Sequence, residues 1–323
     1  MYVGRLAPSP TGALHLGNVR TFMVAWLGAR SLGGRVVMRM EDLDHPRDKP
    51  GAATAVLEDL RWLGFDWDDE FVQSERRAVY RDALDFLRGR DLAYPCVCSR
   101  RDVEAAQSAP HDGDQLFYPG VCRGRFAGWH EAQAFLDAAA GEHGQRRMPC
   151  WRFRVATGET VTFDDAFAGR VESDVSAVLG DFPLARDADG AGYTLACAVD
   201  DLLMGVTEVV RGDDLLAATP AQLLLFRALA DWPPARGMKP PRYCHVPLVV
   251  GEDGRRLAKR HGDTRISAFR AAGHAPDEIV GMLAASCGWA ESGERISLGG
   301  LIGRFDLAAI PRRPFVGSRL MCT

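Results

Sequence analysis

No run of apolar residues in this chain is long enough to cross a membrane. A spanning helix needs about 18 or more mostly apolar residues in succession, and every apolar stretch here is interrupted by charged or polar residues well before that length. The N-terminus also lacks the apolar core of a secretory signal peptide, because Arg5 and Pro8 interrupt it at once. These absences predict a cytoplasmic protein with no membrane partner.

An excess of basic charge is missing as well, and so is any internal repeat or low-complexity tract. The chain has 39 Lys and Arg against 43 Asp and Glu, for a net charge of -4. Nothing global therefore indicates nucleic acid, although local basic faces would be enough to bind it. Such faces could form at residues 100–101, at Arg123 with Arg125, at residues 146–147 and at residues 255–261. A solvated surface is the simpler interpretation of any one of them.

The order of the predicted elements indicates the α/β class. With 323 residues, of which 47% are hydrophobic, the chain can bury a large core. The pattern of apolar residues predicts strands over residues 3–7 and 35–40 and helices over residues 19–32, 50–63 and 75–88. Alternating strands and helices favour a parallel sheet, which binds its ligands at the carboxyl ends of the strands.

The pattern changes between about residues 94 and 180. Cysteine, proline and glycine cluster there, and "WRFRV" with "ETVTF" predicts a pair of strands. This segment is typical of an insertion with a small core of its own. We therefore divide the chain into a main α/β domain of residues 1–263, interrupted by the insertion at residues 94–180, and a short helical extension over residues 264–323.

Regular α/β signals return after the insertion. We expect returning strands in "GYTLACAVDD" and "TEVVRGDDL", a helix over residues 220–230 and a strand over residues 245–250. Weakly helical segments follow over residues 266–305.

The stretch "LAPSPTGALHLGNVR", residues 6–20, predicts a phosphate site. A glycine after a strand lets a flat ligand approach the backbone, and the N–H groups at a helix start attract anions. A histidine at position 15 beside them can stabilise charge that grows on a phosphate. "HLGN" alone is also typical of a surface turn, but "APSPTG" before it and "RMEDLD" at the next strand end favour the phosphate site.

Together these motifs resemble those of a known enzyme family. "GRLAPSPTGALHLGN" resembles the HIGH signature of class I aminoacyl-tRNA synthetases, in the form of the glutamyl and glutaminyl branch. The resemblance continues in order through "RMEDLD", "YTLACAVDDLLMGVTEVVRGDDLL" and "PLVVGEDGRRLAKRHG", the last being similar to the KMSKS loop. It implies a Rossmann-like catalytic domain and a ligase that activates glutamate with ATP and Mg²⁺ before transferring it to tRNA.

The resemblance also implies an amino-acid pocket. The segment that would hold glutamate consists of Arg5, Leu6, Ala7, Pro8 and Ser9, with Arg5 on the side-chain carboxylate. Glu41 would receive the amino group, and Tyr193 and Arg211 would add two further contacts. The chemistry agrees, because an amino acid with a second carboxylate needs cations, an anion and a hydroxyl, and arginine selects carboxylates in a bidentate manner. Each arginine could instead form a structural ion pair.

The same resemblance assigns ATP contacts to His15, Gly17, Asn18, Arg256 and Lys259, of which His15 and Lys259 would be catalytic. The loop departs from the family pattern, since Arg256-Leu257-Ala258-Lys259 stands where a lysine, an apolar residue, a serine and a lysine are usual. Lys259 keeps the charge that faces the departing pyrophosphate. Arg256 keeps charge but not shape, and Ala258 lacks a hydroxyl. A noncatalytic relative that binds tRNA therefore stays an alternative.

Cysteines in the insertion indicate a metal site. Cys96, Cys98 and Cys122 in a loop-rich segment fit zinc, which favours soft ligands in a closed tetrahedral site. Reduced structural cysteines would show the same spacing. In some glutamyl enzymes a histidine two residues past the last cysteine completes the site, but here that position is Gly124. The resemblance then makes Tyr118 the fourth ligand of one structural Zn²⁺. The remaining cysteines show no ligand spacing: Cys150, Cys197, Cys244, Cys287 and Cys322.

The length of the chain favours one branch of the family. A full glutamyl-tRNA synthetase carries a large C-terminal anticodon-binding part, whereas this sequence ends at Thr323, so we expect no such domain. A short form with a tyrosine at its zinc site resembles the branch that esterifies glutamate to queuosine at the wobble position of tRNA(Asp). We therefore expect a monomer whose partners are ATP, L-glutamate and the anticodon loop of tRNA(Asp).

Two further alternatives stay open at this point. The nearer is a truncated glutamyl-tRNA synthetase that charges a tRNA 3′ end. A small-molecule adenylyltransferase shares a histidine-based signature, but it would not explain Glu41, Tyr193 and Arg211 together.

Overall fold

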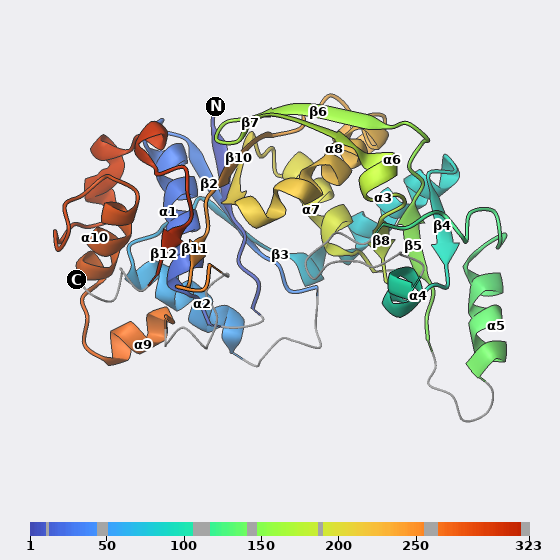
Figure 1. The fold of residues 1–323 in the computed structure, drawn as a ribbon, viewed down its shortest axis with the longest axis horizontal. Coiled ribbons are helices and arrows are strands. Elements are labelled where there is room, and N and C mark those ends of the chain that lie inside the picture. The colour runs from blue at the N-terminus through green and yellow to red at the C-terminus, as the bar shows by residue number, and fades with distance from the viewer. Residues whose placement is uncertain are drawn as a thin grey trace.

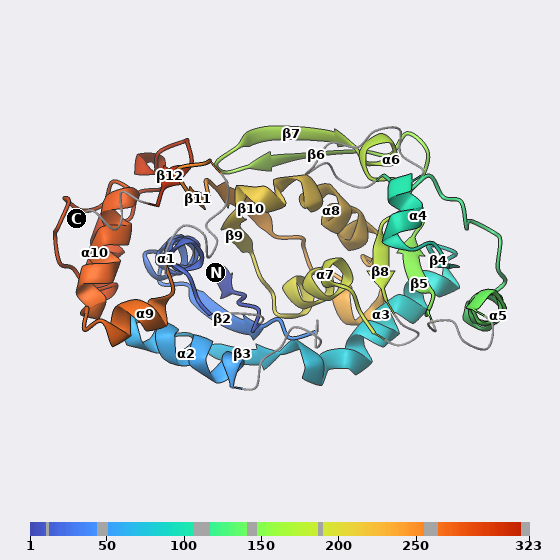
Figure 2. The same ribbon diagram turned by 60° about the horizontal axis from the view of Figure 1, so that its bottom comes forward.

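The computed structural model describes residues 1–10, 13–43, 51–105, 117–140, 147–186, 190–254 and 264–317. Figure 1 shows an elongated molecule, with the C-terminal helices beside α1 at one end and the insertion at the other. Turning the molecule keeps the two groups at opposite ends (Figure 2). None of the helices in these ranges is both long and apolar enough to span a bilayer.

The N-terminal unit is a parallel sheet in the order β1-β2-β3, formed by β1 (Val3–Leu6), β2 (Arg35–Met40) and β3 (Asp69–Val72). The helices α1 (Leu16–Arg30) and α2 (Ala52–Trp62) follow the first two strands, which confirms the predicted strand–helix alternation. The first helix begins at Leu16 rather than at residue 19, and His15 is its extended N-cap residue, with φ -109° and ψ 156°. The predicted phosphate site therefore begins at the histidine itself.

The helix predicted over residues 75–88 is confirmed with slightly different bounds. A 3₁₀ turn over Gln73–Arg76 leads into α3 (Arg77–Gly89), where we expect a helix over residues 75–88. Pro50, the expected first residue of the preceding helix, lies outside the described residues. In the structure, α2 begins directly after Gly51, whose φ of 78° lies in the left-handed region that favours glycine.

A second sheet has the order β7-β6-β10-β9, formed by β6 (Thr160–Asp165), β7 (Gly169–Asp174), β9 (Glu208–Gly212) and β10 (Arg242–Val246). In it β10 runs parallel to both β9 and β6, while β6 and β7 form an antiparallel hairpin. The Thr207 amide donates to the Val3 carbonyl at 2.9 Å, so β9 begins beside β1. This contact brings the carboxyl ends of β1, β2 and β9 to the same region.

Two predictions for the later elements were wrong in part. "GYTLACAVDD" is not a returning strand but belongs to α7 (Tyr193–Leu203), whose Leu195, Val199 and Leu202 are buried at helical spacing. The strand over residues 245–250 is interrupted, because Pro247 has no N–H for a ladder, and β11 (Val249–Val250) is a separate strand. The helix near residues 220–230 is confirmed as α8 (Thr219–Ala228), which follows a 3₁₀ turn over Asp213–Ala218.

A third sheet is antiparallel and is formed by strands from the insertion and from the residues just after it. Its order is β4-β5-β8, formed by β4 (Ala93–Cys96), β5 (Cys150–Phe153) and β8 (Pro183–Ala185). The two strands predicted at "WRFRV" and "ETVTF" exist, but they do not pair with each other. The glycine turn at Gly169 folds β7 back onto β6, whereas β5 pairs with β4 and β8. The short helices here are α4 (Arg100–Ala105), α5 (Trp129–Ala140) and α6 (Val175–Val178).

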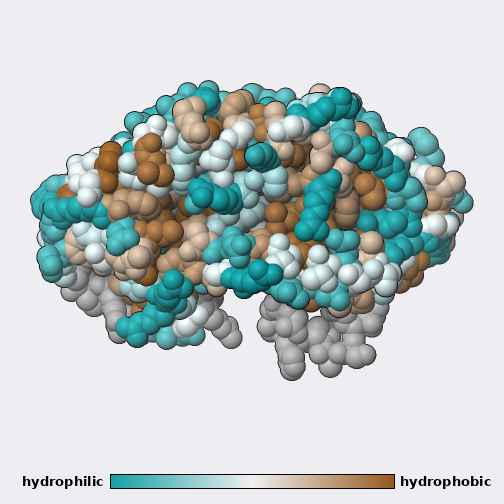
Figure 3. Space-filling model, turned by 90° about the horizontal axis from the view of Figure 1, so that it is seen from above, coloured by the Kyte–Doolittle hydropathy of each residue, from teal (hydrophilic) through white to brown (hydrophobic). Residues whose placement is uncertain are grey.

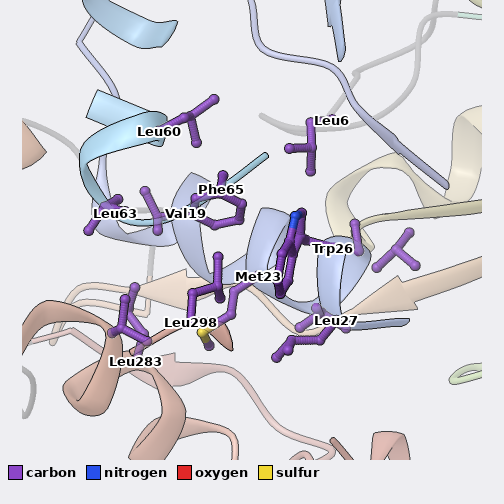
Figure 4. Packing of buried hydrophobic residues seen from close by; sticks show 14 of the residues in the cluster. Leu6, Val19, Met23, Trp26, Leu27, Leu60, Leu63, Phe65, Leu283 and Leu298 are labelled. Carbon is purple, nitrogen blue, oxygen red and sulfur yellow. The ribbon is translucent and has the colours of Figure 1, made fainter. Parts of the chain in front are cut away.

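The C-terminal elements share a hydrophobic core with the N-terminal unit. These elements are α9 (Ile266–Ala271), α10 (Pro276–Ser286), 3₁₀ turns over Gly299–Arg304 and Leu307–Ala309, and β12 (Phe315–Val316), which pairs with β11. Leu283 and Leu298 lie near Met23 and Leu27 of α1 in this core (Figure 4). Arg20 is buried there too, and donates to Ser286 Oγ and to the Pro247 carbonyl, both at 2.9 Å.

Candidate active site

A cavity of about 530 Å³ opens at the carboxyl ends of β1, β2 and β9 and at the start of α1. Most residues assigned to glutamate and ATP from the sequence line it: Arg5, Ala7, Pro8, Ser9, His15, Gly17, Asn18, Glu41, Tyr193 and Arg211. Leu6 does not line it. Successive side chains of a strand point to opposite faces, so Arg5 faces the cavity while Leu6 is fully buried in the core (Figure 4).

Two buried arginines face this cavity with donors to spare. Arg5 Nη1 donates to the Val210 carbonyl at 3.2 Å, and its Nε lies 3.6 Å from Asp201 Oδ1. Arg211 donates through Nη2 to Thr219 Oγ1 at 2.8 Å and through Nε to His245 at 2.9 Å. Within the described part of the chain, no protein group accepts from Arg5 Nη2 or from Arg211 Nη1. The pair can therefore bind an anionic ligand without breaking its own contacts.

Glu41 is held by a buried ionic network below the cavity. Its Oε1 accepts from Arg39 Nη2 at 3.0 Å, and the Cys197 thiol lies 3.3 Å from the same oxygen. Arg39 has no solvent exposure and also donates to Asp201 Oδ1 at 2.6 Å. Burial alone would lower the pKa of Arg39, but the charges around it, that of Asp201 foremost, hold its pKa well above the ordinary value. Among the described residues only Oε1 has protein partners, which leaves Oε2 for a cationic ligand group.

Asp200 fixes this network to the rest of the fold. It is fully buried and accepts from Arg76 Nε at 2.8 Å, Gln73 Nε2 at 3.0 Å and the Tyr80 hydroxyl at 2.8 Å. Because its neighbour on α7 contacts Arg39, the helix joins β2 to the turn that precedes α3. A carboxylate with three donors is stable without solvent.

His15 lies beside Thr264, the residue that follows the basic segment in the sequence. Its Nδ1 lies 3.2 Å from Thr264 Oγ1, and the Leu16 amide donates to the Thr264 carbonyl at 3.0 Å. Thr264 directly follows residues 255–263, which contain Arg256 and Lys259 and lie outside the described residues. Gly17 and Asn18 belong to the first turn of α1, whose N–H groups and dipole favour an anion.

The predicted metal ligands come together in the insertion. The Sγ atoms of Cys96, Cys98 and Cys122 all lie within 4.8 Å of one another, and those of Cys98 and Cys122 are 3.6 Å apart. The Tyr118 hydroxyl lies 3.2 Å from Cys96 Sγ and 3.6 Å from Cys98 Sγ. Three soft sulfur donors and one oxygen, nearly closed to solvent, fit a structural zinc ion. The structure thus brings Cys96, Cys98 and Cys122 into a cluster that could hold a metal, with the Tyr118 hydroxyl beside it.

An arginine supports this cluster. Arg152 on β5 donates from Nε to Cys96 Sγ at 3.2 Å, and its guanidinium carbon lies 3.8 Å from the centre of the Tyr118 ring. Hydrogen bonds from the neighbouring thiols of Cys122, Cys150 and Cys98 lower the pKa of Cys96. Gly180 allows the close approach of Tyr118, since a Cβ there would lie 2.0 Å from the Tyr118 carbonyl oxygen.

Comparison with known proteins agrees with this geometry. Residues 2–310 match the family of class I tRNA synthetases (E and Q), catalytic domain. A glutamyl-Q tRNA(Asp) synthetase from Rhodopirellula baltica is 45% identical over 97% of this chain and 96% of its own length. One from Symbiobacterium thermophilum is 44% identical over 97% of this chain and 95% of its own length. Among solved structures, a glutamate tRNA ligase from Elizabethkingia meningosepticum in complex with its amino acid has a similar fold, with a TM-score of 0.77 and 25% sequence identity. The match covers 99% of this chain and 68% of the ligase chain.

The chain belongs to the glutamyl-Q tRNA(Asp) synthetase family. Membership confirms the class I synthetase fold, with its parallel sheet, that the sequence motifs predict. The protein is accordingly a ligase of the aminoacyl-tRNA synthetase type, and the family implies binding of ATP, glutamate and a tRNA.

From the sequence, Tyr193 was placed on the wrong element, and three buried residues at the site were not identified. Tyr193 is the first residue of α7 rather than part of a strand, and it still lines the cavity, with 44% of its surface exposed. Arg39, Asp201 and His245 were not singled out. A signal existed for the first two, because an arginine inside an apolar strand and an Asp-Asp pair inside an apolar helix both need buried partners.

Proposed function

We propose that this protein activates L-glutamate with ATP and Mg²⁺ and transfers it to queuosine at the wobble position of tRNA(Asp). One observation carries the glutamate assignment. A single cavity holds two buried arginines and one glutamate, and within the described residues each arginine keeps a donor, and the glutamate an oxygen, without a protein partner. Two cationic groups and one anionic group match the two carboxylates and the ammonium group of glutamate.

The activation step requires positioning and charge neutralisation more than covalent chemistry by the protein. The α-carboxylate of glutamate attacks the α-phosphorus of ATP, the bond to the β-phosphate oxygen breaks, and pyrophosphate leaves with that electron pair. His15 and the first turn of α1 lie where they can meet the phosphate charge. We assign Lys259, from the sequence, to the departing pyrophosphate.

The transfer step breaks the mixed anhydride. A hydroxyl of the cyclopentenediol ring of queuosine attacks the glutamyl carbonyl carbon, an ester forms, and AMP leaves. The names of the relatives support this acceptor, since they combine glutamyl-Q with tRNA(Asp). An anticodon loop presents unstacked bases, which suit an open cleft. Figure 3 shows a face of the molecule on which hydrophilic and apolar residues are interspersed.

Pyrophosphate exchange tests the activation step. We expect glutamate-dependent exchange of label between pyrophosphate and ATP without any tRNA, and we expect glutamine to be a poor substrate. Glutamine lacks the side-chain carboxylate that we assign to Arg5, and sites built for a charged group reject its neutral analogue. Equal exchange with both amino acids would show that the pocket has been misassigned, and an absence of exchange with either would favour a noncatalytic tRNA-binding protein.

We propose that the cluster of Cys96, Cys98, Tyr118 and Cys122 binds one structural Zn²⁺. Purified protein should contain about one zinc per chain, and Cys98→Ser should lose it and open the insertion locally, because metal binding and folding are coupled at such sites. Metal analysis with limited proteolysis of the insertion measures both effects. Cys287→Ala, a buried cysteine in the N-terminal core, is the control and should keep its zinc. A wild-type protein that contains no zinc would contradict this assignment.

A further inference from the structure

Three buried polar side chains on neighbouring strands form a chain that ends at the cavity. His245 on β10 lies between Asp165, at the end of β6, and Arg211 on β9, with which it is in register. His245 Nδ1 is 2.6 Å from Asp165 Oδ2, and Arg211 Nε is 2.9 Å from His245 Nε2. The exposed fraction of each residue is 5% or less. Neither Asp165 nor His245 lines the cavity, so any effect on a ligand passes through Arg211.

Hydrogen-bond directions fix the protonation of the ring. Asp165 Oδ1 accepts from the backbone amides of Phe167, Ala168 and His245, so the carboxylate accepts on both of its oxygens. Burial would raise the pKa of Asp165, but the hydrogen bond from His245 and those from the backbone lower it. The ring proton therefore lies on Nδ1. Nε2 must carry a lone pair, because an arginine Nε–H can only donate.

We propose that His245, in its neutral Nδ1–H form, is a positioning residue that orients Arg211 toward a carboxylate of glutamate. This inference rests on the proposed glutamate activation. The acceptor on His245 fixes Nε of the guanidinium, and Thr219 fixes Nη2 at 2.8 Å. With two of its three nitrogens held inside the protein, the guanidinium has one orientation and presents Nη1 to the cavity. Asp165 contributes indirectly, because it accepts the hydrogen bond from Nδ1–H and so selects the tautomer of His245.

Protonation of His245 would undo this arrangement. A second ring N–H would then point at the N–H of Arg211, and two donors cannot bond to each other. The acceptor left for it is Thr219 Oγ1, which lies 3.1 Å from Nε2 and already accepts from Arg211 Nη2. The charged groups that face His245 are Asp165 from β6, Arg211 from β9, Arg5 from β1 and Asp213 from the turn after β9, while Tyr243 stacks on the ring. Burial and then the positive charges of Arg211 and Arg5 lower the pKa of His245. They outweigh the hydrogen bond to the Asp165 carboxylate and the negative charge of that group, which raise the pKa. The ring is thus neutral at neutral pH, and the KM for glutamate should rise only in acid.

Two substitutions distinguish the hydrogen bond that His245 makes to Asp165 from the one it accepts from Arg211. His245→Asn keeps an amide N–H near the position of Nδ1 for Asp165 but has no acceptor within reach of Arg211. His245→Gln places a carbonyl oxygen near the position of Nε2, and this acceptor does not titrate. In pyrophosphate exchange we expect His245→Asn to raise the KM for glutamate about tenfold or more, the usual scale for a lost hydrogen bond to a charged group. The KM for ATP and kcat should stay unchanged.

His245→Gln provides the rescue. We expect its KM for glutamate to lie close to that of the wild type, with no rise in acid. The inference is overturned if His245→Asn binds glutamate as well as the wild type, if it weakens ATP equally, or if His245→Gln keeps the acid rise. Should His245→Asn fail to fold, the pH profile of His245→Gln still decides. Failure of the proposed function itself differs visibly, because the wild type would then show no glutamate-dependent exchange.

Discussion

Arg5→Ala should reduce kcat/KM for glutamate by roughly 30-fold to several thousand-fold, which corresponds to about 2–5 kcal/mol. The reason is the position of Arg5 inside the cavity wall. Its guanidinium is buried, its Nη1 is held by the Val210 carbonyl, and Nη2 has no acceptor among the described residues. Removing it leaves the side-chain carboxylate of bound glutamate without the cation that we assign to it. Steady-state pyrophosphate exchange at varied glutamate concentration measures the loss.

Two further variants define what the Arg5 result means. Arg5→Lys keeps the charge but loses the planar fork, so it should fall between the wild type and the alanine variant. Arg30→Ala removes an arginine of α1 that pairs with Asp66 and Asp68 at 2.8 Å, away from the cavity, and should leave kcat/KM unchanged. An Arg5→Ala protein with wild-type kcat/KM for glutamate would show that Arg5 serves only the ion pair with Asp201.

Glu41→Gln should produce a loss of similar size, again about 2–5 kcal/mol in kcat/KM for glutamate. The substitution removes the anion that we assign to the ammonium group and can place an amide N–H where an acceptor is required. Arg39 keeps Asp201 as a partner at 2.6 Å, so the buried network survives and the melting temperature should change little. The same exchange assay, together with a thermal melt, separates lost binding from lost folding.

The matched control for this prediction is Glu70→Gln. Glu70 lies on β3 at the molecular surface and pairs with Arg61 at 3.5 Å, and exposed pairs of this kind contribute little. Its loss should change neither the melt nor the exchange. If Glu41→Gln activates glutamate as efficiently as the wild type, the ammonium group binds elsewhere.

Local sequence patterns were sufficient for the elements that position the cavity. The strands predicted over residues 3–7 and 35–40 and the helix predicted over residues 19–32 follow from apolar periodicity, and their bounds differ from those in the structure by a few residues at most. The proximity of Cys96, Cys98 and Cys122 was predictable because thiol spacing is a local signal, whereas Tyr118 as a fourth ligand rests on the family resemblance. The error at Tyr193 was avoidable. Leu195, Val199 and Leu202 follow the helical period, which outweighs the strand-like composition of that segment.

The rest depends on contacts between residues far apart in the sequence. Arg39 meets Asp201 across 162 positions, and Asp165 meets His245 across 80. No periodicity encodes such pairs, because each forms only when separate strands and helices pack together. The same applies to strand pairing in the insertion, where β5 pairs with β4 and β8 rather than with the next strand along the chain. Sequence identifies which charged residues need buried partners but not which partners they find.

The acceptor of the glutamyl group tests the central claim most directly. Labelled glutamate, ATP and Mg²⁺ are incubated with tRNA(Asp) from cells that make queuosine and from cells that do not. Each product is cleaved with a nuclease so that the anticodon fragment and the 3′-terminal fragment can be separated and counted. We predict label only on the anticodon fragment and only in the queuosine-bearing tRNA. Equal label on both tRNAs, or label on the 3′-terminal fragment, would contradict the assignment and indicate a synthetase that charges the 3′ end.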